Sequence, residues 1–282
     1  MKIAITSDSV IDLTKELLEK YDITLIPFNF LLGDEDYKDG DITTADIFEY
    51  VNKTGVLPKT SAVNEAGFIE FFESVLKDYD AIIHFDISSE MSTTCNNAIS
   101  ASKQFNGKVE VIDSRNLSTG VALLAIYARN LTETESDIKV IADKVRSRTG
   151  DVQASFIVER LDYLFKGGRC SALQLLGANI LKVRPKIAVT DGKMGMAGKY
   201  RGPMPSVIAN YCKDVLIENP NADKSLVFLT YSSATPEMIK SAYEALENAG
   251  FETIYETKAG CTVSCHCGPN TMGILFLNNA KN

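Results

Sequence analysis

Residues 81–113, AIIHFDISSEMSTTCNNAISASKQFNGKVEVID, decide how the first half of the chain folds. The stretch begins with an apolar run at 81–85 and ends with a second at 109–113, and both are short and rich in β-branched residues, which predicts two strands. Between them, residues 91–104 predict a helix. A strand, a helix and a further strand in this order form the unit from which parallel sheets are built.

The same alternation continues on both sides of this stretch. The predicted elements are strands at 2–6 and within 23–32, a loop at 33–40, and helices at 12–21, 43–53, 64–77, 117–130 and 135–148. The helix at 43–53 starts with Thr43 or Thr44, a common capping residue, and carries Asp46 in its first turn. The first half is therefore predicted to form a parallel, doubly wound α/β sheet.

The regular alternation of predicted strands and helices ends at Thr149-Gly150. The second half predicts a hairpin at 186–200 around Asp191-Gly192, which is a strong hairpin turn signal. Its other predicted elements are helices at 203–218 and 236–249 and strands at 225–231, 251–256 and 273–277. We expect two domains, an N-terminal α/β domain at 1–150 and a C-terminal α+β domain with a mixed sheet at 151–282.

Composition excludes several classes of partner. The 282 residues carry a formal net charge of −8, so nucleic-acid phosphates and anionic membranes would repel the chain, and we expect no nucleic-acid partner. No run approaches the roughly 18–20 apolar residues of a spanning helix, so we expect no membrane-spanning segment. The chain shows no signal peptide, and its six cysteines form no evident secreted framework. We expect a soluble cytoplasmic protein.

Several nucleotide and catalytic motifs are absent from the sequence. It has no G-x-x-x-x-G-K-[ST] phosphate loop, no G-x-G-x-x-G after a predicted strand, and no G-x-S-x-G nucleophile elbow. Catalysis by this chain alone therefore has weak support, and we expect no cofactor.

Hydroxyl side chains gather in loops where strands are predicted to end, and in open α/β sheets such loops line the ligand crevice. The loops are Ser7-Asp8-Ser9, Lys59-Thr60-Ser61, Ser88–Thr94 and Asp113-Ser114. Ser92 and Thr93 are predicted to lie in the first turn of a helix, whose free N–H groups suit a carboxylate or phosphate. Turn and helix-cap chemistry is the alternative explanation for any one loop.

Basic residues in two glycine-bearing segments also indicate an anion site. Gly167-Gly168 permits a turn that projects Arg169 from the end of a short predicted helix. Lys199 and Arg201 lie in a second tight segment and could converge with Arg169. Guanidinium groups suit carboxylates and phosphates, although an isolated arginine is usually a solvated surface residue.

The two histidines have different surroundings. His84 lies in the predicted apolar strand at 81–85 and is predicted to be a hydrogen-bonded core residue. His266 lies in a glycine- and proline-bearing stretch, CTVSCHCGPNTMG at 261–273, which we expect to be a loop. A histidine there is placed for hydrogen bonding to a ligand or for proton transfer.

Three cysteines around His266 raise the possibility of a zinc site. They are Cys261, Cys265 and Cys267. Structural zinc usually takes two separated ligand pairs, and three consecutive residues cannot readily all face one ion. We expect no metal, and buried thiols instead.

Seven segments, taken in order, resemble the DegV family, whose members include the fatty-acid-binding subunits of bacterial fatty-acid kinase. They are ITSDSVIDL at 5–13, PKTS at 58–61, SSEMST at 88–93, DSRNLSTG at 113–120, LDYLFKGGRCS at 161–171, KYR at 199–201 and HCGPN at 266–270. The resemblance covers nearly the whole chain. It implies an apolar tunnel between two α/β domains, with the carboxylate of a bound fatty acid near the mouth.

The resemblance also implies roles for single residues. By likeness to the family's motifs, Thr60 with Ser61, Ser92 and His266 would hold the carboxylate. Three departures from the family pattern leave the head-group geometry open. They are Thr93 and Asn270, where glycine is usual, and Ala62-Val63 after the Thr-Ser pair.

The same resemblance implies a partner. Arg169 and Arg201 would serve near the phosphorylated head group or at the interface with a kinase. The chain would be a non-catalytic carrier that presents one long-chain fatty acid to a separate ATP-dependent fatty-acid kinase, which forms the acyl phosphate.

Two other functions stay open. One is a small-substrate enzyme related to dihydroxyacetone kinase, in which His266 captures a carbonyl compound. The other is a metal-binding regulator built on the cysteines at 261–267. A long apolar tunnel favours the carrier, a small polar pocket the enzyme, and stoichiometric zinc the regulator.

Overall fold

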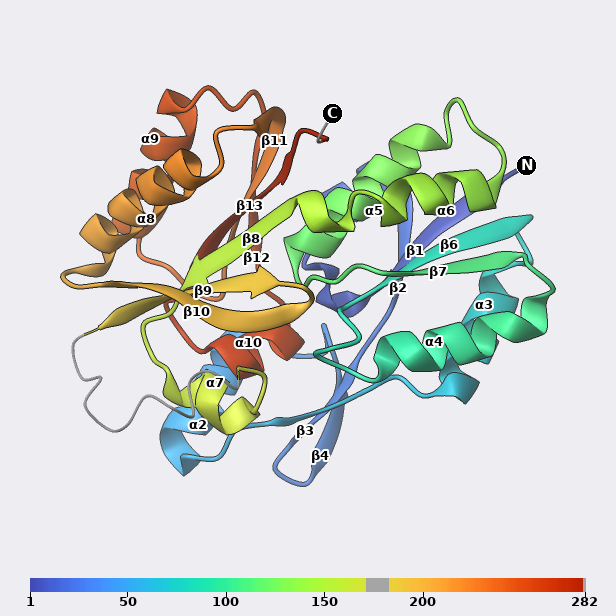
Figure 1. Ribbon diagram of the computed structural model, residues 1–282. Helices are drawn as coiled ribbons and strands as arrows, with labels where there is room; N and C mark the ends of the chain where they lie inside the picture. The colour runs from blue at the N-terminus through green and yellow to red at the C-terminus, as the bar shows by residue number, and fades with distance from the viewer. Residues whose placement is uncertain (171–182, 281–282) are drawn as a thin grey trace.

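The computed structural model describes residues 1–170 and 183–280, and these form a parallel sheet, a mixed sheet and a small antiparallel sheet (Figure 1). The predicted combination of a parallel α/β sheet with a separate mixed sheet is confirmed. Ser171, the last residue of the segment at 161–171, lies outside the described residues.

The parallel sheet has four strands, and helices cover both of its faces (Figure 1). Ala4 and Ile82 pack with one pair of helices, whereas Ile3, Ile5 and Ile83 pack with the other, because successive side chains of a strand point to opposite faces. The strands are, in spatial order, β2 (Ile23–Ile26), β1 (Ile3–Asp8), β6 (Ala81–Asp86) and β7 (Val109–Asp113). The helix pairs are α3 (Glu65–Val75) with α4 (Thr94–Ser102), and α5 (Thr119–Leu131) with α6 (Ile138–Arg146).

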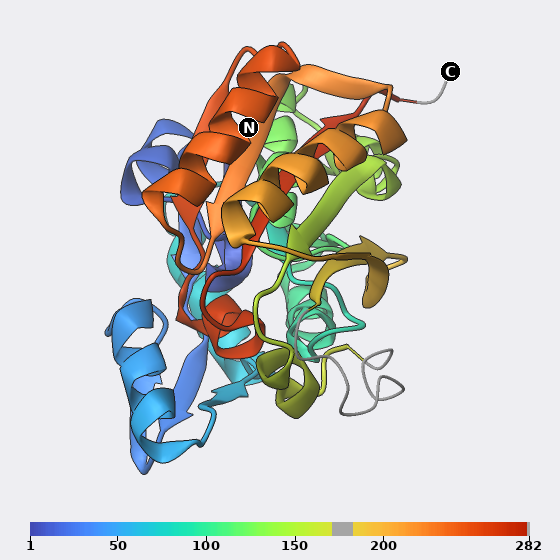
Figure 2. The same cartoon turned by 90° about the vertical axis from the view of Figure 1, so that its left-hand side faces the viewer.

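All strands of the mixed sheet follow residue 150. They are, in spatial order, β10 (Lys193–Tyr200), β9 (Arg184–Thr190), β8 (Val152–Ile157), β13 (Met272–Asn278), β11 (Ala222–Tyr231) and β12 (Ile254–Lys258). Helices α8 (Met204–Glu218) and α9 (Pro236–Asn248) cover its outer face (Figure 2). On the other side, α5 contacts both β1 and β8, so the two halves pack against each other. The division into domains at residue 150 stays a prediction.

The third sheet corrects the prediction for residues 23–40. Pro27, which has no N–H to donate to a sheet, separates β2 from a second strand, and the predicted loop at 33–40 contains a third. Strands β3 (Asn29–Leu32), β4 (Glu35–Lys38) and β5 (Lys59–Ser61) pair antiparallel. Together with α2 (Thr44–Thr54), they form a small lobe at the lower left of Figure 2.

Several helix ends differ from the prediction. Asp12 adopts a left-handed backbone with a φ of 53°, so the predicted helix at 12–21 is only α1 (Lys15–Lys20), preceded by η1 (Ser9–Ile11). The cap of α2 is as predicted, because Thr43 and Asp46 exchange hydrogen bonds in a capping box. Within the described residues, the other short helices are η2 (Lys103–Phe105), η3 (Thr149–Asp151) and α7 (Asp162–Gly167).

The largest correction concerns residues 261–273. Their first half is a helix, α10 (Cys261–Cys267), and not a loop. It packs against α2, β5, α7 and η1, which places it between the small lobe and the parallel sheet (Figures 1 and 2). His266 is therefore a helix residue.

None of the helices within residues 1–170 and 183–280 combines the length and the apolar character that a bilayer span requires.

Candidate ligand-binding site

A cavity of about 640 Å³ is lined by residues of α10, β5, the hairpin of β9 and β10, and the loops of the parallel sheet. This volume lies in the usual range for small-molecule sites, roughly 300–1,000 Å³. Its polar wall includes Thr60, Ser92, Arg169 and His266. Its apolar wall includes Val10, Phe28, Ile87, Leu117, Met194 and Val263. Residues from both halves of the chain therefore build one site.

Strand β5 separates the two hydroxyl residues of the Thr-Ser pair. Thr60 lines the cavity, whereas Ser61 is exposed and does not line it. Adjacent side chains of a strand point to opposite faces, so only one of the pair can face the cavity.

His266 and Thr60 meet in the wall of the cavity. Its Nε2 lies 3.0 Å from Thr60 Oγ1. Burial, and secondarily the charge of Arg169, lower the pKa of His266 to about 4, so the imidazole is neutral at pH 7. Among the described residues, its Nδ1 has no hydrogen-bond partner.

Each of the two positions before Arg169 requires a glycine, for a different structural reason. Gly168 ends α7 in a left-handed conformation, with a φ of 68°. Gly167 instead allows a close approach, because a Cβ at this position would lie 2.5 Å from His266 Nδ1. The turn brings Arg169 to the cavity wall, where its Nη1 donates to Gly167 O over 2.7 Å.

Ser92 reaches the cavity from the loop between β6 and α4. That helix begins at Thr94, so Ser92 and Thr93 precede it, and the prediction that they lie in its first turn is wrong. The Ser92 hydroxyl is held locally: Oγ accepts from Thr94 N at 3.2 Å and lies 2.9 Å from Thr94 Oγ1. Thr93 also lines the cavity.

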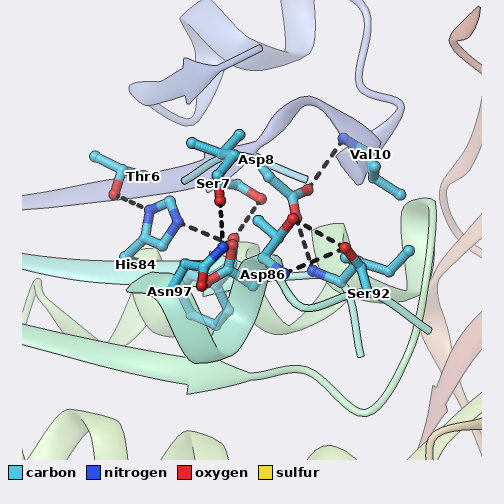
Figure 3. A network of polar contacts seen from close by, with 12 residues as sticks. Thr6, Ser7, Asp8, Val10, His84, Asp86, Ser92 and Asn97 are labelled. Carbon is cyan, nitrogen blue, oxygen red and sulfur yellow. Dashed lines mark hydrogen bonds and ion pairs between the residues drawn. The ribbon is translucent and has the colours of Figure 1, made fainter. Parts of the chain in front are cut away.

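A buried polar network lies under this loop (Figure 3). His84 bridges Thr6 and Asp86, with its Nδ1 2.7 Å from Thr6 Oγ1 and its Nε2 3.3 Å from Asp86 Oδ1. The prediction that His84 is a hydrogen-bonded core residue is confirmed.

The neighbouring carboxylate of Asp8 fixes two residues of the cavity wall. It accepts from Val10 N at 3.0 Å and from Ile87 N at 2.8 Å, and both of these residues line the cavity. Burial and the nearby Asp86 raise the pKa of Asp8 well above its usual value.

Two further aspartate side chains hold the N-terminus of α10. Asp12 Oδ1 accepts from Gly260 N at 2.7 Å, and Asp39 Oδ1 accepts from Cys261 N at 2.9 Å. Burial raises the pKa of Asp12 to about 8, although the hydrogen bond that Ser118 donates to it acts in the opposite direction and lowers the pKa. The helix that carries His266 is therefore anchored by residues from the first 40 of the chain.

The cysteines of α10 face two directions. Cys261 and Cys265 pack against the small lobe, whereas Cys267 lines the cavity. All three are buried, and burial raises the pKa of each thiol, which keeps it protonated. Within the described part of the chain, no group of three or more His, Cys, Asp or Glu side chains is placed to hold a metal ion.

A second, small pocket of about 30 Å³ continues the cavity inward. Leu117, Val263 and Cys267 line both spaces. Two hydroxyl residues of this inner pocket use their oxygens elsewhere: Thr230 Oγ1 lies 2.7 Å from Thr119 Oγ1, and Ser232 donates to Gly268 O. Their hydrogen bonds turn the polar atoms away, which leaves apolar surface for a ligand.

The predicted convergence of three basic residues is wrong. Arg169 lines the cavity, but Arg201 is exposed at the end of β10 and neither it nor Lys199 lines the cavity. Instead, Lys193 lines it and forms an ion pair of 3.2 Å with Glu90, another lining residue. No sequence motif marks Lys193, nor Thr262, which also lines the cavity one helical turn before His266.

The structure explains why asparagine is tolerated at position 270, where glycine is usual in the family. It adopts a φ of 53°, in the left-handed region that glycine and asparagine tolerate best. Its backbone N–H donates to Ser233 Oγ at 2.9 Å and its side chain donates to Glu159, which stabilises the turn. Asparagine can therefore replace glycine here without a change of backbone.

Comparisons with known proteins agree with this architecture. A family model described as an uncharacterised protein of the DegV family matches residues 2–279. A DegV domain-containing protein of Clostridium perfringens is 30% identical over 282 residues, which cover 98% of each chain.

Two solved structures share the fold. A DegV family protein from Thermus thermophilus, described by its fatty acid binding, matches with a TM-score of 0.91 at 24% identity, covering 99% of this chain and 100% of that one. A stearic acid-binding protein from Eubacterium ventriosum matches with a TM-score of 0.85 at 26% identity, covering 99% of both chains. This chain belongs to the DegV family.

Proposed function

We propose that this chain is a cytoplasmic carrier that binds one long-chain fatty acid in the cavity and has no catalytic activity of its own. One observation carries the proposal: a single cavity is lined by hydroxyls, a histidine and an arginine on the one hand and by apolar side chains on the other, and three of its lining residues also line a smaller inner pocket. A molecule with a small anionic head and a long apolar chain matches this division.

The energetics favour such a ligand. Each buried CH₂ group contributes about 0.8 kcal/mol, so an acyl chain leaves a membrane only for an equally dry site. A buried carboxylate must be hydrogen-bonded, because an unpaired buried charge is very costly. Thr60, Ser92 and His266 would supply these bonds, and Arg169 would compensate the charge. Ser61 is left out of this set, because it lies on the other face of β5.

The relatives support the ligand class. The Thermus thermophilus and Eubacterium ventriosum proteins are described as binding a fatty acid and stearic acid, respectively. The second is 26% identical to this chain over nearly its full length.

We further propose that a separate ATP-dependent kinase phosphorylates the bound acid. In that reaction a carboxylate oxygen bonds to the γ-phosphorus of ATP, and ADP leaves. Arg169, exposed at the cavity wall, would face the phosphorylated head group. Arg201, exposed directly after the edge strand β10, would contact the partner. Guanidinium groups suit both a phosphate and an acidic protein surface.

A thermal-shift assay tests the ligand class. The protein is stripped of lipid, and its melting temperature is measured with palmitate, oleate, methyl palmitate or a short polar acid such as acetate. A ligand that binds only the folded state raises the melting temperature. We expect palmitate or oleate to raise it more than the methyl ester, and acetate to leave it unchanged. No shift with any long-chain acid would contradict the proposal.

A further inference from the structure

Helix α10 contributes a hydroxyl residue to the cavity wall besides the residues assigned above. Thr262 lines the cavity and is only 5% exposed. Among the described residues, its Oγ1 has no hydrogen-bond partner. A buried hydroxyl without a partner costs free energy, so such groups are uncommon in folded proteins.

The local structure does not use this hydroxyl. Thr and Ser side chains inside helices usually bond to a backbone carbonyl of the preceding turn. Ser264 on the same helix follows this rule, because its Oγ donates to Ala259 O over 3.2 Å. Thr262 does not. Its Oγ1 is covered by protein atoms while the residue lines the cavity, so a rotation about χ1 would turn the hydroxyl toward a molecule bound there.

The spacing of Thr262 places it beside the assigned head-group residues. Thr262 and His266 are four residues apart on α10, so they share a face with Cβ atoms roughly 5–6 Å apart. A hydrogen bond spans about 2.5–3.0 Å, so both side chains can reach the two oxygens of one carboxylate.

We propose that Thr262 is a further binding residue, whose hydroxyl donates to the carboxylate of the bound fatty acid alongside Thr60, Ser92 and His266. The proposal rests on the proposed function of fatty-acid binding. It adds a donor from the helix that also carries His266, so that α10 holds the head group at two points.

The test compares three variants in palmitate binding and in thermal unfolding without ligand. Thr262→Val keeps the shape and removes the hydroxyl, and Thr262→Ser keeps the hydroxyl. Thr235→Val makes the same change at the N-cap of α9, where the hydroxyl accepts from Met238 N and does not line the cavity.

We expect Thr262→Val to weaken palmitate binding about tenfold, as for a hydrogen bond to a charged group. Its melting temperature without ligand should be equal to or higher than that of the parent, because an unpartnered buried hydroxyl is lost. Thr262→Ser should restore the affinity. Thr235→Val should show the opposite pattern, with a lower melting temperature and unchanged affinity.

Hexadecanol has the same chain length as palmitate but no carboxylate, so comparing the two ligands shows whether Thr262 contacts the carboxylate. Thr262→Val should weaken the binding of hexadecanol much less than that of palmitate. An equal loss for both ligands, or palmitate affinity equal to that of the parent, would overturn the assignment of Thr262. If the parent itself binds no long-chain acid, the proposed function fails, and that outcome is distinct from a failure of Thr262 alone.

Discussion

Thr60 Oγ1 lies 3.0 Å from His266 Nε2, which joins the small lobe of the first half to the helix that precedes the last strand. The imidazole is neutral, because burial lowers its pKa to about 4. The pair therefore offers hydrogen bonds and no net charge. Arg169, whose charge also lowers this pKa, is the nearby cation.

Thr60 and Ser61 provide a matched pair of substitutions. Thr60→Val should weaken fatty-acid binding by about ten- to a hundredfold, because a hydrogen bond to a charged group contributes roughly 1.5–3 kcal/mol. Ser61→Ala should leave the affinity unchanged, because this side chain is exposed on the other face of β5. Titration calorimetry with palmitate measures both. Equal losses would show that the strand does not orient the pair as described.

Gly167 tests the packing behind His266. In Gly167→Ala the new methyl would lie 2.5 Å from His266 Nδ1, so the ring or α7 must move. We expect lower stability, by about 1–3 kcal/mol as for other overpacked sites, and weaker fatty-acid binding. Gly150→Ala is the control, since a methyl group at this position would meet no atom within 4 Å. Parent-like affinity in Gly167→Ala would contradict the close approach.

The raised pKa of Asp12 leads us to expect an unusual pH dependence of the protein's stability. Its pKa is about 8 when folded and roughly 4 when unfolded, so between these values the folded protein holds a proton that the unfolded chain releases. This group therefore makes the free energy of unfolding fall as pH rises from about 4 to 8. His266 acts oppositely between about 4 and 6.5, because its folded pKa is the lower one.

With both effects included, the free energy of unfolding should fall between about pH 6.5 and 8, by up to about 1.4 kcal/mol per pH unit. Urea unfolding at several pH values measures it. Asp12→Asn should reduce the fall, and the part that persists is expected from Asp8, whose raised pKa acts in the same direction, whereas Asp34→Asn, at an exposed position, should retain the whole fall. An Asp12→Asn variant with the pH dependence of the parent would show that Asp12 titrates normally.

Arg201 tests the proposed kinase contact separately from ligand binding. Arg201→Ala should leave palmitate affinity unchanged, because this residue is exposed and does not line the cavity. With the cognate kinase, it should lower the rate of acyl-phosphate formation by about tenfold or more, as for an interfacial arginine. Lys139→Ala, exposed on α6, is the control. A parent-like rate would exclude Arg201 from the interface.

The sequence predicts the two large sheets well and the small one poorly. The strands of the parallel sheet are apolar runs between helices, and Asp191-Gly192 marks the hairpin of β9 and β10. Strand β4, by contrast, is Glu-Asp-Tyr-Lys, with no apolar alternation to detect. Such a short polar strand forms because β3 and the lobe's own core hold it, which no local pattern records.

The site is predictable where a motif carries it and not where tertiary contacts do. Thr60, Ser92, Arg169 and His266 follow from motifs, and all four line one cavity. Helix α10 was predicted as a loop, because its flanking glycines and its cysteines are weak helix signals. Aspartate side chains from the first 40 residues hold it, so the helical face that Thr262 and His266 share became visible only in the structure.

Mass spectrometry of an organic extract tests the central claim most directly. The purified protein is denatured, its lipids are extracted, and the acyl species are quantified against the protein. We predict close to one long-chain fatty acid per chain, and much less in a Thr60→Val, His266→Ala double variant purified in parallel. An extract of the folded parent without any acyl species, from a protein that also takes up no added palmitate, would contradict the account.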